Sequence, residues 1–198
     1  MTLQALDHLP FTGDEEADRL LAREPMALLI GFALDQQVPV QWAFSAPAVL
    51  KERLGTIDPR ALAEMDPAQL EAAAKGPPAI HRFPSAMARR IGELATYLTA
   101  TYDGDAARVW TDASDASDMK RRIGELPGFG DMKVTSIYAV LVKLLGQRPT
   151  GWESELPQHP TLGDADSPQA LADYQAKKRA HKAALRAVAN ETNQTTPH

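Results

Sequence analysis

The chain has 198 residues, enough to bury a full hydrophobic core, and its 44% hydrophobic and 24% charged residues are ordinary for a globular protein. It contains no cysteine, which excludes a disulfide, a thiolate zinc site and a cysteine-ligated iron–sulfur cluster. The longest apolar run, residues 26–34, is too short to span a bilayer, and no signal peptide opens the chain, so we expect a cytoplasmic protein.

The net charge of −5 taken alone argues against a nucleic-acid partner, but the charges are segregated along the chain. Acids dominate residues 1–24 and 153–173, whereas bases dominate residues 75–90, 120–148 and 177–186. Such segregation can give an acidic protein one positive face, which duplex DNA binding needs. Solvated blocks of charge are the commoner cause, so the charge pattern supports a DNA partner without requiring one.

Helix signals follow one another along the whole chain. Thr12 and Glu15 have the spacing of a capping box, which predicts a first helix over about residues 13–23. Pro25 suits the first position of a second helix that ends near Asp35 and is apolar on all sides, as a buried helix is. Further helices are predicted at residues 40–54, at 85–101, 105–110, 115–125, 131–145 and 168–190, and as two short ones between 58 and 76.

No segment alternates polar and apolar residues over the length of a strand, so the sequence predicts an all-α protein. We expect a single domain over residues 1–192, with the helical hairpin at residues 115–145 inside it. The polar residues 193–198 are predicted to form a disordered tail.

The turn Leu-Pro-Gly-Phe-Gly at residues 126–130 joins two of these helices. Pro127 cannot continue a helix, and the Gly-x-Gly pair lets the backbone turn tightly and approach a ligand. The next helix then begins with free N–H groups at the turn, which form a ready anion site. The turn by itself fits either a plain helix–helix connection or a phosphate-binding hairpin.

With the order of the surrounding elements over roughly residues 24–154, this turn resembles the helix-hairpin-helix motif of the HhH-GPD DNA glycosylase superfamily. Three shorter motifs resemble those of a small bacterial subgroup described as base-excision-repair type: His-Arg-Phe-Pro at 81–84, Gly-Phe-Gly-x-x-Lys at 128–133 and Pro-x-Gly-Trp at 149–152. The resemblance implies a two-lobed all-α fold with a cleft between the lobes. It also implies a monomer that binds damaged double-stranded DNA and is associated with the bacterial nucleoid.

The resemblance assigns most of the candidate site to the hairpin. In the family, the glycine amides hold a DNA phosphate, and hairpin carbonyls often hold a Na⁺ or K⁺ ion. Carried over, the carbonyls are those of Gly124, Leu126 and Phe129, and no other cofactor is required. The DNA contacts carried over or suggested beside the hairpin are Gln37, His81, Arg82, Gly128, Phe129, Gly130, Met132 and Lys133.

The sequence departs from the family at the position of the catalytic lysine. Bifunctional members carry a lysine two residues after the second hairpin glycine, where this chain has Met132. Lys133 follows and projects about 100° away around the helix. A nucleophilic lysine also needs a lowered pKa in a dry pocket. Lys133 is therefore expected either to contact phosphate or to be solvated, and no strand-cutting lyase activity is expected.

The position of the family's catalytic aspartate also differs. Counting from the proline-threonine pair at 149–150 places Ser154 there, between Glu153 and Glu155. Either glutamate is a candidate for stabilising the cationic sugar, with Asp131 as a less favoured third. The alternative is that both glutamates are ordinary acidic loop residues. The catalytic glutamate of the adenine-specific members aligns near Gly31, so that chemistry is absent.

Three other positions keep two interpretations each. Gln37 either fills the gap left by a flipped base or is a surface glutamine. Trp152 either stacks on a flipped base or closes the core between the lobes. His81 and Arg82 either contact the pocket or a phosphate, or form a local hydrogen-bonded turn.

Three functions therefore compete. The first is a monofunctional DNA glycosylase that removes a damaged base with water. The second is a catalytically inactive module that binds DNA lesions or structures on the same fold. A general all-α interaction protein is the third, for which the hairpin would be a coincidence.

Overall fold

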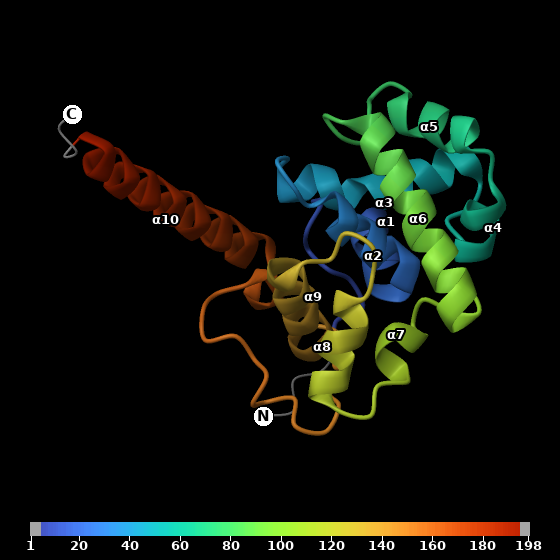
Figure 1. Cartoon of the computed structure of the whole chain (residues 1–198). Helices are drawn as coiled ribbons and strands as arrows, with labels where there is room; N and C mark the ends of the chain where they lie inside the picture. The colour runs from blue at the N-terminus through green and yellow to red at the C-terminus, as the bar shows by residue number, and fades with distance from the viewer. Residues whose placement is uncertain (1–4, 195–198) are drawn as a thin grey trace.

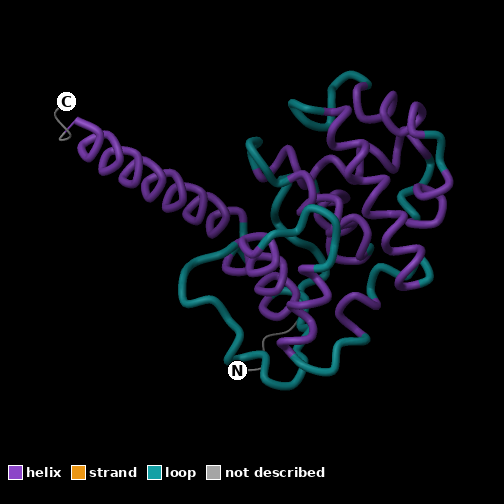
Figure 2. The backbone as a smooth tube through the Cα atoms, viewed as in Figure 1, coloured by secondary structure: helices purple, strands orange, loops and turns teal. Residues whose placement is uncertain are grey.

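The computed structural model describes residues 5–194, and the described part is all-helical, as the sequence predicts. The predicted tail begins inside the last helix, and residues 195–198 lie outside the described part. Figure 1 shows the helices in chain order and Figure 2 the loops between them. The elements are α1 (Glu15–Arg23), α2 (Pro25–Leu34), α3 (Val40–Leu54), α4 (Pro59–Glu64), α5 (Pro67–Lys75), α6 (Pro84–Tyr102), α7 (Arg108–Thr111), α8 (Ala116–Gly124), α9 (Asp131–Lys143), the 3₁₀ helix η1 (Leu162–Asp164) and α10 (Pro168–Gln194).

Helix α2 is the buried centre of the fold, as its uniform apolarity predicts. It packs against α1, α3 and α6. Phe32 of α2 meets Phe44 of α3 edge to face at 5.1 Å between ring centroids, and Phe11 meets Phe44 in the same way at 5.2 Å. Such pairs add about 0.5–1.5 kcal/mol beyond their buried area. This packing fixes where the C-terminal end of α2 reaches the surface.

Helices α8 and α9 pack against each other, and η1 packs against α9. Gly163 of η1 lies so close to α9 that a Cβ there would come within 2.5 Å of the Ala139 carbonyl carbon. The chain start is tied to the same unit, because the Leu6 N–H donates to the Leu144 carbonyl at 2.8 Å. Buried residues of this unit and of α1–α6 form one continuous core.

The N-cap of α1 corrects the sequence prediction. Asp14, not Thr12, caps the helix, and its carboxylate accepts from the Ala17 N–H at 2.8 Å. The Thr12 hydroxyl instead donates to the buried Asp18 carboxylate at 2.7 Å. Asp18 also accepts from the Phe11 N–H, so Thr12 helps to satisfy a buried charge that a local pattern does not reveal.

Two further differences are local. The short helix expected from residue 105 begins at Arg108, because the Asp105 side chain accepts from the Ala107 N–H and holds residues 105–107 as a turn. The sequence does not predict η1, which starts with a capping box between Thr161 and Asp164. No helix in residues 5–194 is both long and apolar enough to cross a membrane.

Candidate nucleic-acid interface

The turn between α8 and α9 presents its backbone to the surface. Its apolar side chains, Leu126 and Phe129, are buried, whereas Gly128 and Gly130 are exposed. Gly128 has φ +80°, which favours glycine. At Gly130, with ordinary extended φ and ψ, an added Cβ would meet no atom within 4 Å. The buried anchors therefore fix a turn whose glycine amides border open space, as a phosphate site requires.

A guanidinium from α6 lies against this turn. An added Cβ at Gly128 would come within 3.0 Å of Arg90 Nε. A side chain at this position would press on the guanidinium, so glycine favours its close approach to the backbone. Arg90 thus brings positive charge to the candidate phosphate site.

Lys133 joins the first turn of α9 to the last turn of α2. Its Nζ donates to the Ala33 carbonyl at 2.9 Å and lies 5.7 Å from the centre of the Phe129 ring. Burial, together with the nearby Arg90 charge, lowers the pKa of Lys133 to about 8, and Asp35 opposes the shift. From the sequence, Lys133 was expected either to contact a phosphate or to be solvated. The structure shows a third arrangement, a half-buried amine held by a helix C-terminus.

This burial predicts a pH-dependent stability. The folded pKa is about 8 and the ordinary value 10.5, so the folded state loses the proton first as the pH rises. The free energy of unfolding should therefore rise by up to roughly 3 kcal/mol between about pH 8 and 10.5, relative to the variant Lys133→Met. Urea unfolding of both proteins across this range measures the difference, and parallel curves would contradict the buried-amine assignment.

Asp35 stands directly after α2 and was not among the sequence candidates. It is half-buried, and its carboxylate makes no hydrogen bond within the described chain. Burial raises its pKa, while the ammonium groups of Lys178 and Lys133 act in the opposite direction. The one feature of the sequence that could have indicated Asp35 as a candidate is its position directly after a wholly apolar helix. A perturbed, unbonded carboxylate near a basic site is a candidate functional group.

The two residues after Asp35 are held by the His-Arg-Phe-Pro loop. His81 is 1% exposed. Its Nε2–H donates to the Gln36 carbonyl at 3.0 Å, and its Nδ1 accepts from the Phe83 N–H at 3.0 Å. Both ring nitrogens are thus engaged in the local hydrogen-bonded turn, one of the two alternatives for this residue, and neither is left for a phosphate.

Gln37, which follows the Gln36 carbonyl held by His81, is exposed. Its φ of 57° is left-handed, which is uncommon for a residue other than glycine. The bond from His81 to the preceding carbonyl helps to hold that conformation. The Gln37 side chain has no hydrogen bond within residues 5–194, so its amide is available to a ligand.

Two exposed aromatic rings flank His81, at 6.4 Å for Trp42 and 6.0 Å for Phe83 between ring centroids, and neither was among the candidate residues from the sequence. Phe83 is 46% exposed and Trp42 40% exposed. The Arg82 guanidinium lies 4.8 Å from the centre of the Phe83 ring. The Trp42 Nε1–H donates to the Ala79 carbonyl at 3.1 Å, which holds the indole beside the loop. Rings and guanidinium groups so placed are suited to stacking on nucleic-acid bases.

Most basic side chains of the 120–148 block are already occupied. Arg122 and Arg121 bind Asp118, and Arg121 also binds Glu125. The hydrogen bond from Arg122, then that from the Ser114 N–H, holds the pKa of Asp118 well below its usual range. In addition, Lys120 binds Glu155 and Lys143 binds Asp164. Among the side chains that the structure describes, Arg90 and Lys133 are the bases beside the turn that have no acidic partner in an ion pair. Met132, in the family's lysine position, is 84% exposed.

The loop with the sequence's catalytic candidates lies at the other end of α8 from the turn (Figure 1). The Ala116 N–H at the start of α8 donates to the Thr150 carbonyl at 3.0 Å. Helix α8 has nine residues, so the turn lies about 13 Å away along its axis. Glu155 binds Lys120 at 2.8 Å, and Glu153 is exposed.

Trp152 and Ser154 have structural contacts in this loop. Trp152 is half-buried against the core, and the Arg148 guanidinium lies 5.3 Å from its ring centre. Its carbonyl accepts from the Tyr138 hydroxyl at 3.0 Å. The Ser154 hydroxyl donates to the Gly151 carbonyl at 2.8 Å. The structure therefore does not bring these residues together with Gln37, Asp35 and the hairpin glycines.

The hairpin carbonyls fit a monovalent cation in part. The Leu126 carbonyl accepts from the Phe129 N–H at 3.1 Å, which leaves one lone pair. Those of Gly124 and Phe129 accept no hydrogen bond within the described residues. Carbonyl oxygens are the ligands that hard cations prefer. The cation itself remains an expectation from the family.

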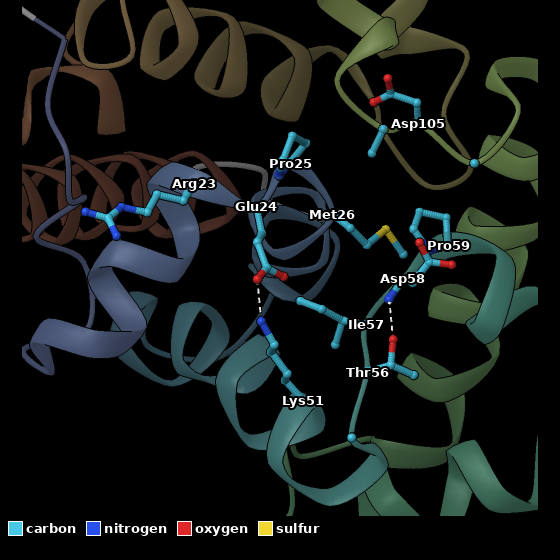
Figure 3. A pocket seen from close by; sticks show the side chains of 13 residues that line it. Arg23, Glu24, Pro25, Met26, Lys51, Thr56, Ile57, Asp58, Pro59 and Asp105 are labelled. Carbon is cyan, nitrogen blue, oxygen red and sulfur yellow. Dashed lines mark hydrogen bonds and ion pairs between the residues drawn. The ribbon is translucent and has the colours of Figure 1, made fainter.

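Two pockets lie away from the hairpin turn. Figure 3 shows one of about 320 Å³ at the N-terminal end of α2, lined by Pro25, Met26, Lys51 and Asp58 among others. Lys51 pairs there with Glu24. Another, of about 640 Å³, lies between α4, α5 and α6. Neither includes the hairpin turn or the residues that follow α2.

Comparison with known proteins identifies the family. The sequence model of the "HhH-GPD superfamily base excision DNA repair protein" family matches residues 30–188, from within α2 through the hairpin and into α10. No curated protein and no solved structure matches the chain. The matched region contains the glycine turn, the end of α2 and the loop that holds Gln36, so the chain belongs to the HhH-GPD superfamily of base excision DNA repair proteins.

Proposed function

We propose that this protein is a monofunctional DNA glycosylase that removes a damaged base from duplex DNA. The observation that carries the proposal is the convergence of three groups at the C-terminal end of α2. Lys133, three residues after the glycine turn, reaches the Ala33 carbonyl, Asp35 follows directly, and the exposed Gln37 stands two residues on. A base-flipping glycosylase needs a phosphate contact, a carboxylate and a gap-filling side chain close together, so this convergence beside the glycine turn supports the proposal.

Binding follows from the turn and its surroundings. The amides of Gly128 and Gly130 hold a backbone phosphate, with Arg90 beside them. The target nucleotide leaves the base stack, Gln37 fills the gap, and Phe83 with Arg82 contacts the neighbouring bases. Phosphate contacts carry no base information, so the protein binds DNA with weak sequence preference.

Chemistry follows from Asp35. As the bond between the sugar C1′ and the base nitrogen breaks, its electrons leave with the base and positive charge develops on the sugar. The Asp35 carboxylate stabilises that charge, and Lys133 and Lys178 favour its ionised form. A water oxygen then bonds to C1′, one water proton is released to the departing base or to solvent, and an abasic site remains. Glu155 and Glu153 are the alternative carboxylates.

Oligonucleotides that carry alkylated, oxidised or deaminated bases test this function. The expected product is an intact strand with an abasic site that is cut only by alkali. Borohydride present during the reaction should trap no protein–DNA adduct, because the family's lysine position holds Met132 and the Lys133 amine is tied to the Ala33 carbonyl.

The lowered pKa of Lys133 favours one other chemistry. An amine with a pKa near 8 is more often unprotonated, which a Schiff-base nucleophile requires. A trapped adduct that Lys133→Met abolishes would therefore make Lys133 the nucleophile and the protein a lyase.

The second candidate function is a lesion-binding module without catalysis. It is favoured by Ser154 in the family's aspartate position, with its hydroxyl bound to the Gly151 carbonyl. Tight binding to abasic or mismatched duplexes, with no base released from any substrate, would select this function.

A further inference from the structure

Helix α10 is the largest feature that the proposed site does not use. It has 27 residues and leaves the body beside the start of α9 (Figures 1 and 2). Leu171 is buried and Tyr174 half-buried, whereas residues 176–180 are all exposed. Residues 176–180 therefore gain no stability from packing against the body.

The base of α10 is fixed next to the candidate interface. Gln175 and Gln41 of α3 exchange side-chain hydrogen bonds of 2.9 and 3.3 Å. Gln41 lies four residues beyond Gln37. The Lys178 ammonium is near enough to Asp35 to oppose the rise in its pKa that burial causes. The helix therefore starts at the proposed site and extends outward from it.

The outer part of α10 is strongly basic. No acid occurs between Asp173 and Glu191, whereas the bases are Lys177, Lys178, Arg179, Lys182 and Arg186. Taking position 178 as zero, positions 182, 186 and 179 follow at roughly 40°, 80° and 100° around the helix axis. Position 175, which binds α3, falls near 60° in the same arc. Four basic positions thus share the side of the helix that faces α3 at its base.

We propose that α10 is a second DNA-binding element, which contacts the phosphates of the duplex flanking the lesion. Residues 177–186 span about 15 Å of helix, along which duplex DNA presents roughly nine phosphates. Ion pairs already occupy the arginines of α8 near the hairpin, so the hairpin has few free bases to bind the phosphates of the flanking duplex. This inference rests on the proposed DNA-binding function.

Other anionic or helical partners fit the helix less well. A membrane-surface helix needs large apolar side chains opposite its basic face. On that side residues 176–184 offer alanine as their only apolar residue, together with Lys177. The concentration of like charge also opposes pairing with a second copy of the same helix.

The test replaces the five bases of residues 177–186 by glutamine, which preserves helix propensity. Two duplexes with a central abasic-site analogue are used, a short one with about three base pairs on each side, closed by hairpin loops, and a long one with about fifteen, since residues 177–186 reach roughly 15 Å, or about five base pairs. On the long duplex, the slope of log K against log salt should become shallower by about 3–4. On the short duplex the slope should change by no more than about 2, because only residues 177–179 lie within about 10 Å of the start of the exposed helix.

A matched pair of double variants controls for net charge. Lys178→Gln with Arg179→Gln should weaken binding to the long duplex, whereas Arg23→Gln with Arg60→Gln should not, because Arg23 lines the pocket at the opposite end of α2 and Arg60 binds the Asp103 carbonyl. If both double variants weakened DNA binding equally, the loss of net positive charge would explain the weaker binding and the proposal would be overturned. So would an unchanged salt slope on the long duplex in the fivefold variant.

Two further outcomes also overturn it. A dimer in sedimentation that dissociates when the five bases are replaced, with DNA binding unchanged, would assign α10 to self-association. Binding of the parent to phosphatidylserine vesicles, with DNA binding unaffected by the replacements, would assign it to a membrane surface. The short duplex distinguishes failure of this proposal from failure of the hairpin proposal. If the hairpin does not bind phosphate, a Gly130 variant should bind the short duplex as tightly as the parent does.

Discussion

Replacing Asp35 by asparagine is expected to lower the rate of base release by roughly 10²–10³, the usual loss when one preorganised electrostatic group is removed. Asparagine keeps the shape but cannot stabilise positive charge on the sugar. Because burial raises the pKa of Asp35, the folded state penalises the ionised form, so the variant should be at least as stable as the parent at neutral pH. Single-turnover kinetics on the preferred lesion measures the rate, and urea unfolding measures the stability.

The matched controls are Glu153→Gln and Glu155→Gln. Both should keep nearly the parent rate, because their loop lies at the far end of α8 from the glycine turn. Removal of the Lys120 ion pair should cost Glu155→Gln only about 1 kcal/mol or less of stability. An inactive Glu155→Gln together with an active Asp35→Asn would move the catalytic centre to the Glu155 loop and refute the Asp35 assignment.

A tryptophan at Gly130 is expected to weaken duplex binding by about 100-fold, or roughly 3 kcal/mol. The amide hydrogen bonds to a charged phosphate are worth about 1.5–3 kcal/mol each, and the indole would block their access. The fold should be unaffected, because Gly130 has ordinary backbone angles and a Cβ there meets no atom within 4 Å. Fluorescence anisotropy with unrelated duplex sequences should show the same loss of affinity for all of them.

Ala72→Trp on the exposed surface of α5 is the control for adding an indole, and it should bind DNA as the parent does. The salt slope of the Gly130 variant should fall by about one for each phosphate that the protein no longer binds. Unchanged affinity in a normally folded Gly130→Trp protein would mean that the turn is a plain helix–helix connection.

The proposed DNA face is built from segments far apart in the chain. Helix α2 leads into Asp35, the loop before α6 supplies Phe83 and holds Gln36 through His81, and α9 begins at the glycine turn. Buried groups hold the backbone of this face, namely His81 at the Gln36 carbonyl and the side chains of Leu126 and Phe129 at the glycine turn. Such a surface is rigid before DNA arrives, which limits the entropy lost on binding.

The sequence by itself determined the all-α class, most helix bounds and the glycine turn. These depend on local chemistry: proline cannot continue a helix, aspartate before proline caps the next one at Asp58 and Asp66, and the apolar run at residues 26–34 has to be buried. The family motif is also a contiguous stretch of sequence, so the resemblance to the HhH-GPD superfamily could be recognised from the residues around Gly128. The family match confirms that resemblance.

Only the tertiary structure decided which side chains meet. Lys133 is tied to a carbonyl 100 residues away, and no spacing within α9 predicts that bond or the pKa near 8 that follows from burial there. Counting along the chain puts Glu155 close to the site, but its loop packs on the start of α8 and Glu155 pairs with Lys120, whereas Asp35 lies close enough to Lys133 to affect its pKa. Burial and charge at a site depend on every element packed around it, so the choice among these carboxylates depends on the packing of α2, α8 and α9.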